Sequence, residues 1–113
     1  MRWSRVSTLA LMVGLVLAAT LHATCTGLVA NVWTDGVWNV VTFEVAATSR
    51  STEVVVELTP LDEDVDVQVL ENGEWVDAAP GEHHTSGVRA KNGDVEVRYA
   101  HAGCEEDLVL GDS

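Results

Sequence analysis

The histidines are the side chains of this chain most suited to hold a transition metal, and two of them, His83 and His84, are adjacent. Neighbouring residues of a β-strand point to opposite faces, so this pair cannot share one metal in regular β structure. A zinc site needs about three or four protein ligands, and only Glu82 and the distant His101 could complete one. A blue-copper site needs cysteine, histidine and methionine close together, but His101 precedes Cys104 and no methionine follows. We therefore expect solvated loop histidines and no metal.

An acidic run offers oxygen ligands for calcium. Asp62, Glu63 and Asp64 are consecutive, and Asp66 follows two residues later. Asp64 and Asp66 would share one face of a strand. Calcium takes about six to eight oxygen ligands, and no EF-hand spacing is present. The weak calcium candidate is therefore the set Asp62, Asp64 and Asp66, and a solvated acidic face is the expected alternative.

Motifs for catalysis and for cofactor binding are absent from the sequence. It contains no nucleophile elbow, no paired-cysteine motif, no zinc-protease motif and no glycine-rich phosphate loop. We therefore predict no catalytic residue, no cofactor and no enzymatic activity. The 18 acidic residues oppose 6 basic ones, giving a formal net charge of −12. Nucleic acid is an unsuitable partner because a phosphate backbone requires a basic surface.

The first 23 residues have the order of a secretory signal peptide. Arg2 and Arg5 precede an apolar stretch over residues 9–19, and small or polar residues follow. The apolar stretch is shorter than the roughly 20 residues that a membrane span requires. A retained membrane anchor is one alternative. A lipid on Cys25 is another, although the residues before this cysteine match a lipoprotein signal poorly.

The acidity belongs to the part of the chain that would be exported. Residues 24–113 contain all 18 acidic residues and four basic ones, for a formal charge of −14. The region has a single lysine, no isoleucine and seventeen valines. This composition resembles that of proteins from extreme halophiles, which implies a protein suited to molar salt, where the Debye length falls to about 3 Å. An acidic extracellular protein from a GC-rich bacterium is the alternative.

The hydrophobic pattern after residue 23 has a period of two, which is typical of β-strands. The expected strands cover residues 37–47, 52–59, 64–70, 95–99 and 108–110, with shorter ones between them and a loose turn over residues 78–82. Seven or eight short strands predict an all-β fold, a small antiparallel two-sheet β-sandwich of immunoglobulin-like size. An open barrel is the alternative. We expect one domain over residues 24–113.

Three dipeptides predict tight hairpins, because Asn-Gly and Asp-Gly accept the positive φ angles of a type I′ turn. They are Asp35-Gly36, Asn72-Gly73 and Asn92-Gly93. Two-residue turns fix the register of the flanking strands. The predicted partners are Trp33 with Trp38 in the first hairpin, Glu71 with Glu74, Leu70 with Trp75 and Val69 with Val76 in the second, and Lys91 with Asp94, Ala90 with Val95 and Arg89 with Glu96 in the third.

These registers place three tryptophans on the side of the strands opposite the valine-rich core. Exposed aromatic side chains are typical of binding surfaces, so the candidate binding residues are Trp33, Trp38, Trp75 and Leu70. The alternative is structural: a bulge changes the phase, a loop covers the indoles, or the first hairpin is buried on both faces.

The two cysteines predict a disulfide between Cys25 and Cys104, as expected for an exported chain with an even cysteine count. It would close a loop of about 80 residues, and the chain-entropy model gives about 4.5 kcal/mol for such a loop. Free thiols and lipidation of Cys25 are the alternatives.

Taken together, the sequence predicts an exported, non-enzymatic binding or interaction module, secreted or at the cell surface. Its partner is an unknown protein or surface ligand. The alternatives are a structural component of a cell-surface assembly and a protein held to the membrane through its N-terminal segment or a lipid.

Overall fold

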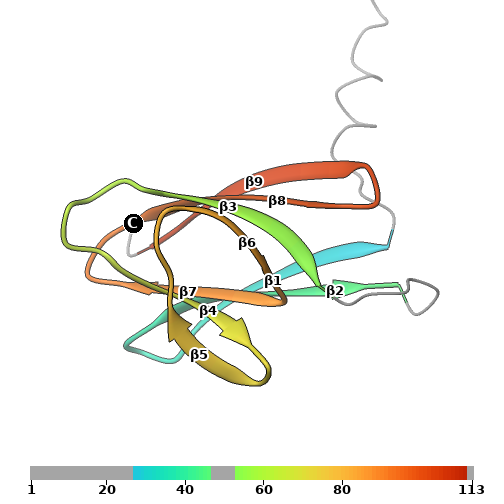
Figure 1. Ribbon diagram of the computed structural model, residues 1–113. Coiled ribbons are helices and arrows are strands. Elements are labelled where there is room, and N and C mark those ends of the chain that lie inside the picture. The colour runs from blue at the N-terminus through green and yellow to red at the C-terminus, as the bar shows by residue number, and fades with distance from the viewer. Residues whose placement is uncertain (1–26, 47–52, 112–113) are drawn as a thin grey trace, which may run out of the picture.

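The computed structural model describes residues 27–46 and 53–111, and within these ranges the chain forms nine strands and no helix (Figure 1). All pairings are antiparallel. The first sheet has the order β1 (Leu28–Thr34), β2 (Asn39–Val45), β7 (Gly87–Lys91), β4 (Asp66–Glu71) and β5 (Glu74–Asp77). The second has the order β6 (Gly81–Thr85), β3 (Val54–Pro60), β8 (Val95–His101) and β9 (Cys104–Leu110). The all-β prediction is confirmed, and the two sheets are consistent with a small β-sandwich.

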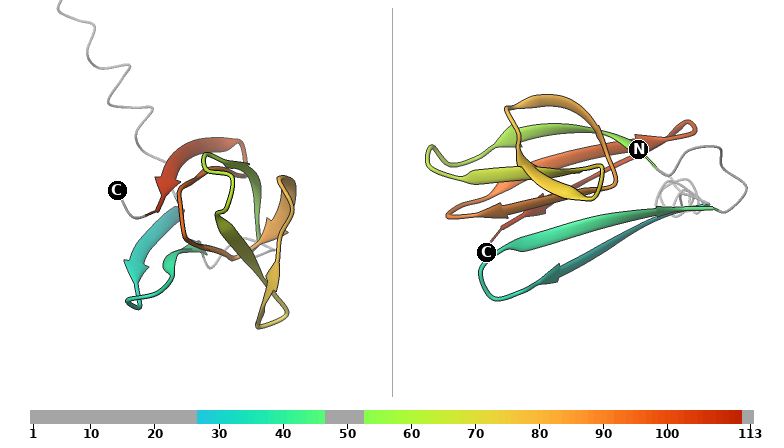
Figure 2. Two further views of the ribbon diagram at one scale, coloured as in Figure 1. Left: turned by 90° about the vertical axis from the view of Figure 1, so that its left-hand side faces the viewer. Right: turned by 60° about the horizontal axis from the view of Figure 1, so that its bottom comes forward.

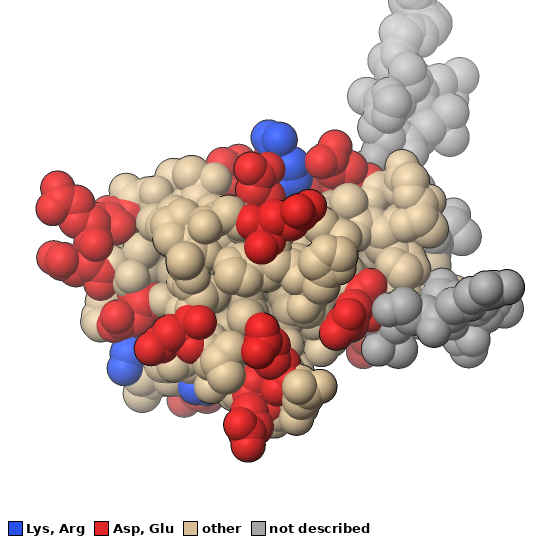
Figure 3. Space-filling view, viewed as in Figure 1, with Lys and Arg blue, Asp and Glu red and all other residues tan. Residues whose placement is uncertain are grey.

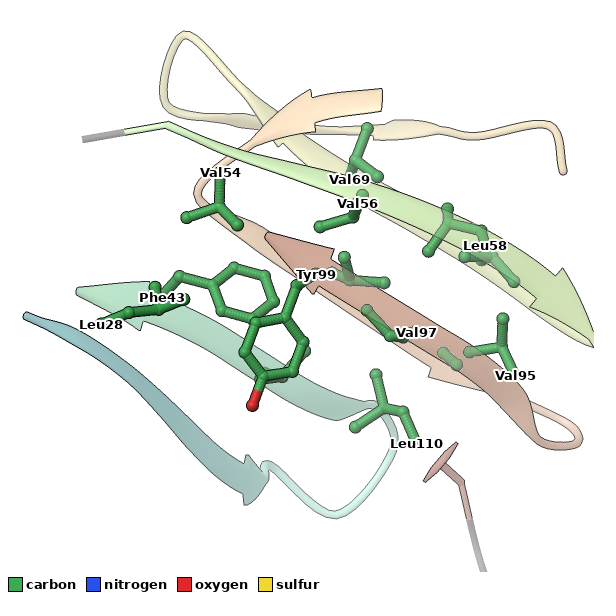
Figure 4. Close-up of a cluster of buried hydrophobic side chains, with 14 residues drawn as sticks. Leu28, Phe43, Val54, Val56, Leu58, Val69, Val95, Val97, Tyr99 and Leu110 are labelled. Carbon is green, nitrogen blue, oxygen red and sulfur yellow. The ribbon is translucent and has the colours of Figure 1, made fainter. Parts of the chain in front are cut away.

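The two sheets form two layers around one core (Figure 2). Alternate residues of the strands point inward, as the period of two predicts. Phe43 of β2 and Tyr99 of β8 meet across the layers with their ring centroids 4.9 Å apart (Figure 4). Most of the other buried side chains are valines, from β2, β3, β4, β7 and β8. Branched valines suit a pleated, buried surface, so the valine-rich composition accounts for the core.

A corner at Thr85 carries the chain from one sheet to the other. Thr85 ends β6 and Gly87 begins β7, so only Ser86 separates strands of different sheets. The Thr85 hydroxyl is buried and lies 2.7 Å from the carbonyl oxygen of Leu70 and 2.9 Å from that of Gly87. It also accepts hydrogen bonds from the backbone N–H groups of Leu70 and Gly87. One side chain therefore fastens β6 to β4 and β7.

The second hairpin has the predicted register. Asn72 and Gly73 have φ angles of 52° and 82°, as a type I′ turn requires. The pairs are those expected: Glu71 with Glu74, Leu70 with Trp75, and Val69 with Val76.

The first hairpin differs from the prediction, because Trp33 lies opposite Val40 and not opposite Trp38. The connection is a four-residue loop over residues 35–38, closed by a hydrogen bond from the N–H of Asp35 to the carbonyl of Trp38. The Asp35 carboxylate accepts hydrogen bonds from the N–H groups of Val37 and Trp38. These side-chain contacts satisfy the backbone of a wider loop and displace the two-residue turn.

The third predicted hairpin is wrong. Asn92 and Gly93 turn the chain, but β7 belongs to the five-stranded sheet and β8 to the other. Ala90 and Val95 are both fully buried on facing sheets. The expected pairs Lys91 with Asp94, Ala90 with Val95 and Arg89 with Glu96 therefore do not form as cross-strand neighbours.

Two further expectations are revised. The structure has nine strands where seven or eight were predicted, because residues 81–85 form β6 and not the end of a loose turn. His83 and His84 consequently lie on a strand and not in a loop. The predicted signal peptide over residues 1–23 and Cys25 lie outside the described residues, so cleavage and the Cys25–Cys104 disulfide remain predictions.

In the described part of the chain no helix is found that could cross a membrane.

Candidate functional site: the tryptophan face

The outer side of the five-stranded sheet carries the candidate binding residues. Along one row of paired residues, Trp33 lies opposite Val40, Val40 opposite Arg89, and Arg89 opposite Gln68. Residues paired across antiparallel strands share a face, and the residues that flank this row in β7 and β4 are buried in the core. We use the name tryptophan face for the outer surface formed by Trp33, Trp38, Leu70, Trp75, Gln68, Arg89 and Lys91.

Arg89 is stacked between two indoles. Its guanidinium carbon lies 4.2 Å from the ring centroid of Trp38 and 4.7 Å from that of Trp75. The ammonium group of Lys91 lies 4.6 Å from the Trp38 ring. Cations within about 6 Å of an aromatic centroid are attracted to the ring. The three residues Trp38, Arg89 and Trp75 therefore form a continuous stack across the sheet.

Hydrogen bonds hold the guanidinium of Arg89 in this orientation. Its Nε and Nη2 donate to the side-chain oxygen of Gln68 at 2.8 and 2.6 Å. The Gln68 amide in turn donates to Asp77 at 3.0 Å. A chain of polar contacts therefore runs from β7 through β4 to β5, along the row of paired residues that contains Arg89.

Trp75 lies over a glycine. A methyl group on Gly87 would come within 3.2 Å of Cη2 of Trp75 and within 3.4 Å of the Val41 carbonyl. The absence of a side chain at Gly87 therefore leaves room for the Trp75 indole to approach β7 closely. A glycine inside a strand is a recognised sign of such close approach, and it is a signal that the sequence contained.

The indoles differ in their exposure. Trp38 and Trp75 are half-buried, and Val40, which shares their face and lies opposite Arg89, is 1% exposed. Trp33 belongs to the edge strand β1 and is 49% exposed. All three tryptophans lie opposite the core, as the phase of the strands predicted. The stack accounts structurally for two of them and leaves Trp33 open to contact.

Asp35, in the loop before Trp38, has a lowered pKa. Hydrogen bonds from the N–H groups of Trp38 and Val37 lower the pKa of Asp35, and the nearby charge of Arg89 contributes in the same direction. Hydrogen bonds to the charged form of a carboxyl group favour that form. Asp35 therefore remains an anion next to the stacked guanidinium at neutral pH.

The tryptophan face also carries most of the positive charge of the described residues. Arg89 and Lys91 lie on it, and Arg98 lies on the other sheet, opposite Glu57 and Asp107. Acidic side chains are spread widely over the surface seen in Figure 3. The tryptophan face thus holds two of the three described basic residues, while Asp66 opposite Lys91 and Asp77 opposite Gln68 add acidic charge to the same outer side. The pairing predicted for the third hairpin assigned Arg89 to Glu96 and so hid its place in this face.

The histidine and aspartate candidates are not brought together into a metal site. His83 and His84 alternate along β6, and the Nε2 atom of His83 lies 2.7 Å from the carbonyl oxygen of Ala79. Asp62 accepts the N–H of Asp94, and Asp66 accepts the side-chain amide of Asn92. Within residues 27–46 and 53–111 no group of three metal-binding side chains occurs, and no pocket is found there.

No family model, curated protein or solved structure matches this chain. The chemistry of the described surface is therefore the basis for any functional proposal.

Proposed function

We propose that this chain is an exported, non-enzymatic interaction module that contacts its partner through the tryptophan face. The observation that carries the proposal is the common placement of Trp33, Trp38 and Trp75 beside Arg89 and Lys91 on one outer sheet face. Tryptophan and arginine are the residues most enriched at the energetic centres of protein interfaces. The stack also holds its side chains in place before binding, which lowers the entropic cost of association.

Export and a saline medium are parts of the same proposal. The signal-peptide pattern supports a location outside the cytoplasm, and the formal charge of −14 over residues 24–113 supports a halophilic environment. In molar salt, long-range charge attraction is screened. Contacts through aromatic and stacked groups then contribute a larger share of the affinity, which suits a partner surface that is aromatic or apolar.

The experiment compares two exposed residues on opposite sheets. The protein and its Trp33→Ala and Val109→Ala variants are immobilised and exposed, in molar KCl, to separated envelope proteins and envelope polysaccharides of the source cells. Val109 is 54% exposed and lies on β9 of the other sheet, so it is a matched control. We expect a component that binds the native and Val109→Ala proteins and is lost with Trp33→Ala. Equal binding by all three proteins, or no binding by any, would contradict the proposal.

A structural component of a cell-surface assembly is the second candidate function. The feature that favours it is the uncharged edge strand β1.

A further inference from the structure

Among the described strands, the two sheets end in four edge strands, and β1 differs from the other three. β5 and β6 contain acidic residues and are four and five residues long, and β9 contains three consecutive acidic residues. β1 has seven residues, LVANVWT, with no charge and no proline. Three of its side chains, Val29, Val32 and Trp33, are between 49% and 60% exposed. Charges and proline normally protect edge strands from pairing with another chain, and β1 has neither.

The free side of β1 presents backbone groups at alternate residues. The carbonyl of Gly27 accepts the N–H of Ala46, and the N–H of Asp35 bonds to the carbonyl of Trp38. In an antiparallel pair, hydrogen-bonded positions alternate along the strand, so the odd-numbered residues of β1 bond to β2. The N–H and C=O groups of Leu28, Ala30, Val32 and Thr34 therefore point away from β2.

We propose that β1 is the dimer interface of this protein, pairing antiparallel with β1 of a second copy about a twofold axis at Asn31. This register uses all seven residues, because Leu28 then meets Thr34 of the second copy and Ala30 meets Val32. On the outer face, Val29 meets Trp33 twice, once on each side of the axis. The strand is self-complementary in this sense, as a twofold interface requires. The two five-stranded sheets join into one continuous sheet.

Charge favours a second copy at this edge over the edges formed by β5 and β9. Two copies that met through β9 or β5 would place acidic residues against each other, which is destabilising. In β1 and β2 together the only acidic residue is Glu44, and the amide of Asn31 donates to its carboxylate at 3.0 Å. Molar salt screens the remaining repulsion between the two domains.

The first test is a pair of proline substitutions, measured by sedimentation equilibrium of the full protein in molar KCl. Val32→Pro removes an N–H that points away from β2, and so removes two intermolecular hydrogen bonds by symmetry. Val109→Pro is the matched control, because Val109 is 54% exposed and its N–H also points to the free side of an edge strand, β9. We expect a native dimer, a dimer constant about tenfold or more weaker for Val32→Pro, and no change for Val109→Pro. A native protein that stays monomeric, or open-ended assemblies in place of a dimer, would overturn the proposal.

The second test reads the register directly. In this register Asn31 faces Asn31 of the second copy in a pair without mutual hydrogen bonds, where Cα atoms lie about 4.5 Å apart. That separation suits a disulfide. Mild oxidation of Asn31→Cys should give a covalent dimer linked through position 31 by peptide mapping, while Val109→Cys stays monomeric. If Val32→Pro fails to fold, Val32→Lys with Val109→Lys replaces the proline pair, and a linked Asn31→Cys dimer still decides the register. Failure of Asn31→Cys to link at native dimer concentrations would refute the axis.

This dimer does not rest on the tryptophan face having a partner. The Val32 side chain lies on the inner side of β1, away from Arg89 and the indole stack. A Val32→Lys protein that is monomeric but still binds the envelope component separates the two proposals. A protein that dimerises but binds no envelope component would support the dimer and contradict the proposed partner of the tryptophan face.

Discussion

Arg89 lies against Trp38 with its guanidinium carbon 4.2 Å from the indole centroid, and the same group contacts Trp75 at 4.7 Å. One arginine thus joins the loop after β1 to the hairpin of β4 and β5. Its position depends on a planar, five-donor group that can stack and bond to Gln68 at once. The ammonium group of lysine is not planar and has three donors, so it cannot stack on an indole and bond to Gln68 in this way.

Arg89→Lys should therefore lower the free energy of unfolding by about 1 kcal/mol, and Arg89→Ala by about 2 kcal/mol. The measurement is thermal unfolding in molar KCl. Arg98→Lys is the control, because Arg98 is exposed on the other sheet, and it should change stability by less than about 0.5 kcal/mol. Equal losses at both positions would show that the stack contributes nothing beyond charge. A double-mutant cycle of Arg89→Ala with Trp75→Ala should give a coupling of at least about 0.5 kcal/mol.

Thr85→Val should destabilise the domain by about 2–3 kcal/mol. The substitution keeps the shape of the side chain but removes the buried hydroxyl that Leu70 and Gly87 contact. A buried backbone group left without a partner costs about 1–3 kcal/mol. Thr85→Ser keeps the hydroxyl and loses only a methyl group, so about 1 kcal/mol is expected. A larger loss for Thr85→Ser than for Thr85→Val would mean that packing, and not hydrogen bonding, dominates at this corner.

Tyr99 makes the free energy of unfolding depend on pH in the alkaline range. Burial, followed by its hydrogen bond to Glu106, raises the pKa of Tyr99 to about 12, above the ordinary value near 10. The unfolded chain therefore loses this proton at lower pH than the folded chain. The contribution of Tyr99 is complete below pH 10 and is lost as the pH rises through 12.

The chain has one tyrosine, so ultraviolet absorbance of the phenolate reports Tyr99 alone. We expect a midpoint near pH 12 in the folded protein. The free energy of unfolding should fall more steeply between pH 10 and 12 for the native protein than for Tyr99→Phe. A midpoint near 10 in the folded protein would contradict the raised pKa of Tyr99.

The disulfide prediction can be checked by mass. Cys104 begins β9, and Cys25 lies two residues before the first described residue. Alkylation before reduction should add nothing to the intact protein, and alkylation after reduction should modify two thiols. The same spectrum gives the start of the chain, near residue 21 or 24 if the signal peptide is removed. Ready alkylation without reduction, or a lipid mass on Cys25, would refute the Cys25–Cys104 bond.

Lowering the salt should destabilise the folded protein. A formal charge of −14 in a domain of this size repels itself when the Debye length grows from about 3 Å in molar salt to about 10 Å at 0.1 M. Thermal unfolding should therefore shift to lower temperature between molar and tens of millimolar KCl. An unchanged melting temperature would argue against the halophilic proposal and for the acidic extracellular alternative.

Whether a hairpin register was predicted correctly depended on the hydrogen bonds and φ angles of its turn residues. The Asn72-Gly73 hairpin was predicted correctly because both turn residues adopt positive φ and nothing competes with them. Asp35 also precedes a glycine, but its carboxylate bonds to Val37 and Trp38 and widens the loop. The register therefore shifted by two residues, which preserves the phase and kept Trp33 and Trp38 on the same face.

The alternation of apolar and polar residues could not distinguish two strands that pair within one sheet from two strands that face each other across the core. The strands around Asn92-Gly93 have the same pattern whether they pair in one sheet or oppose each other across the core. The complete burial of Ala90 and Val95 reflects the second arrangement. β6 was missed because its sequence, GEHHT, lacks apolar alternation. It is a strand through pairing with β3, which no local propensity encodes.

The corner at Thr85 has a consequence for how the domain opens. The Leu70 and Gly87 amides are bonded to a hydroxyl on the neighbouring strand, and the Ser86 carbonyl accepts the N–H of Phe43. The layers meet there within a single residue, so neither sheet can detach while the other stays intact. In native-state hydrogen exchange, these amides should exchange only through the complete opening reaction, together with the central valines. The two sheets would then behave as one cooperative unit, with no half-open species from which a strand could be exchanged.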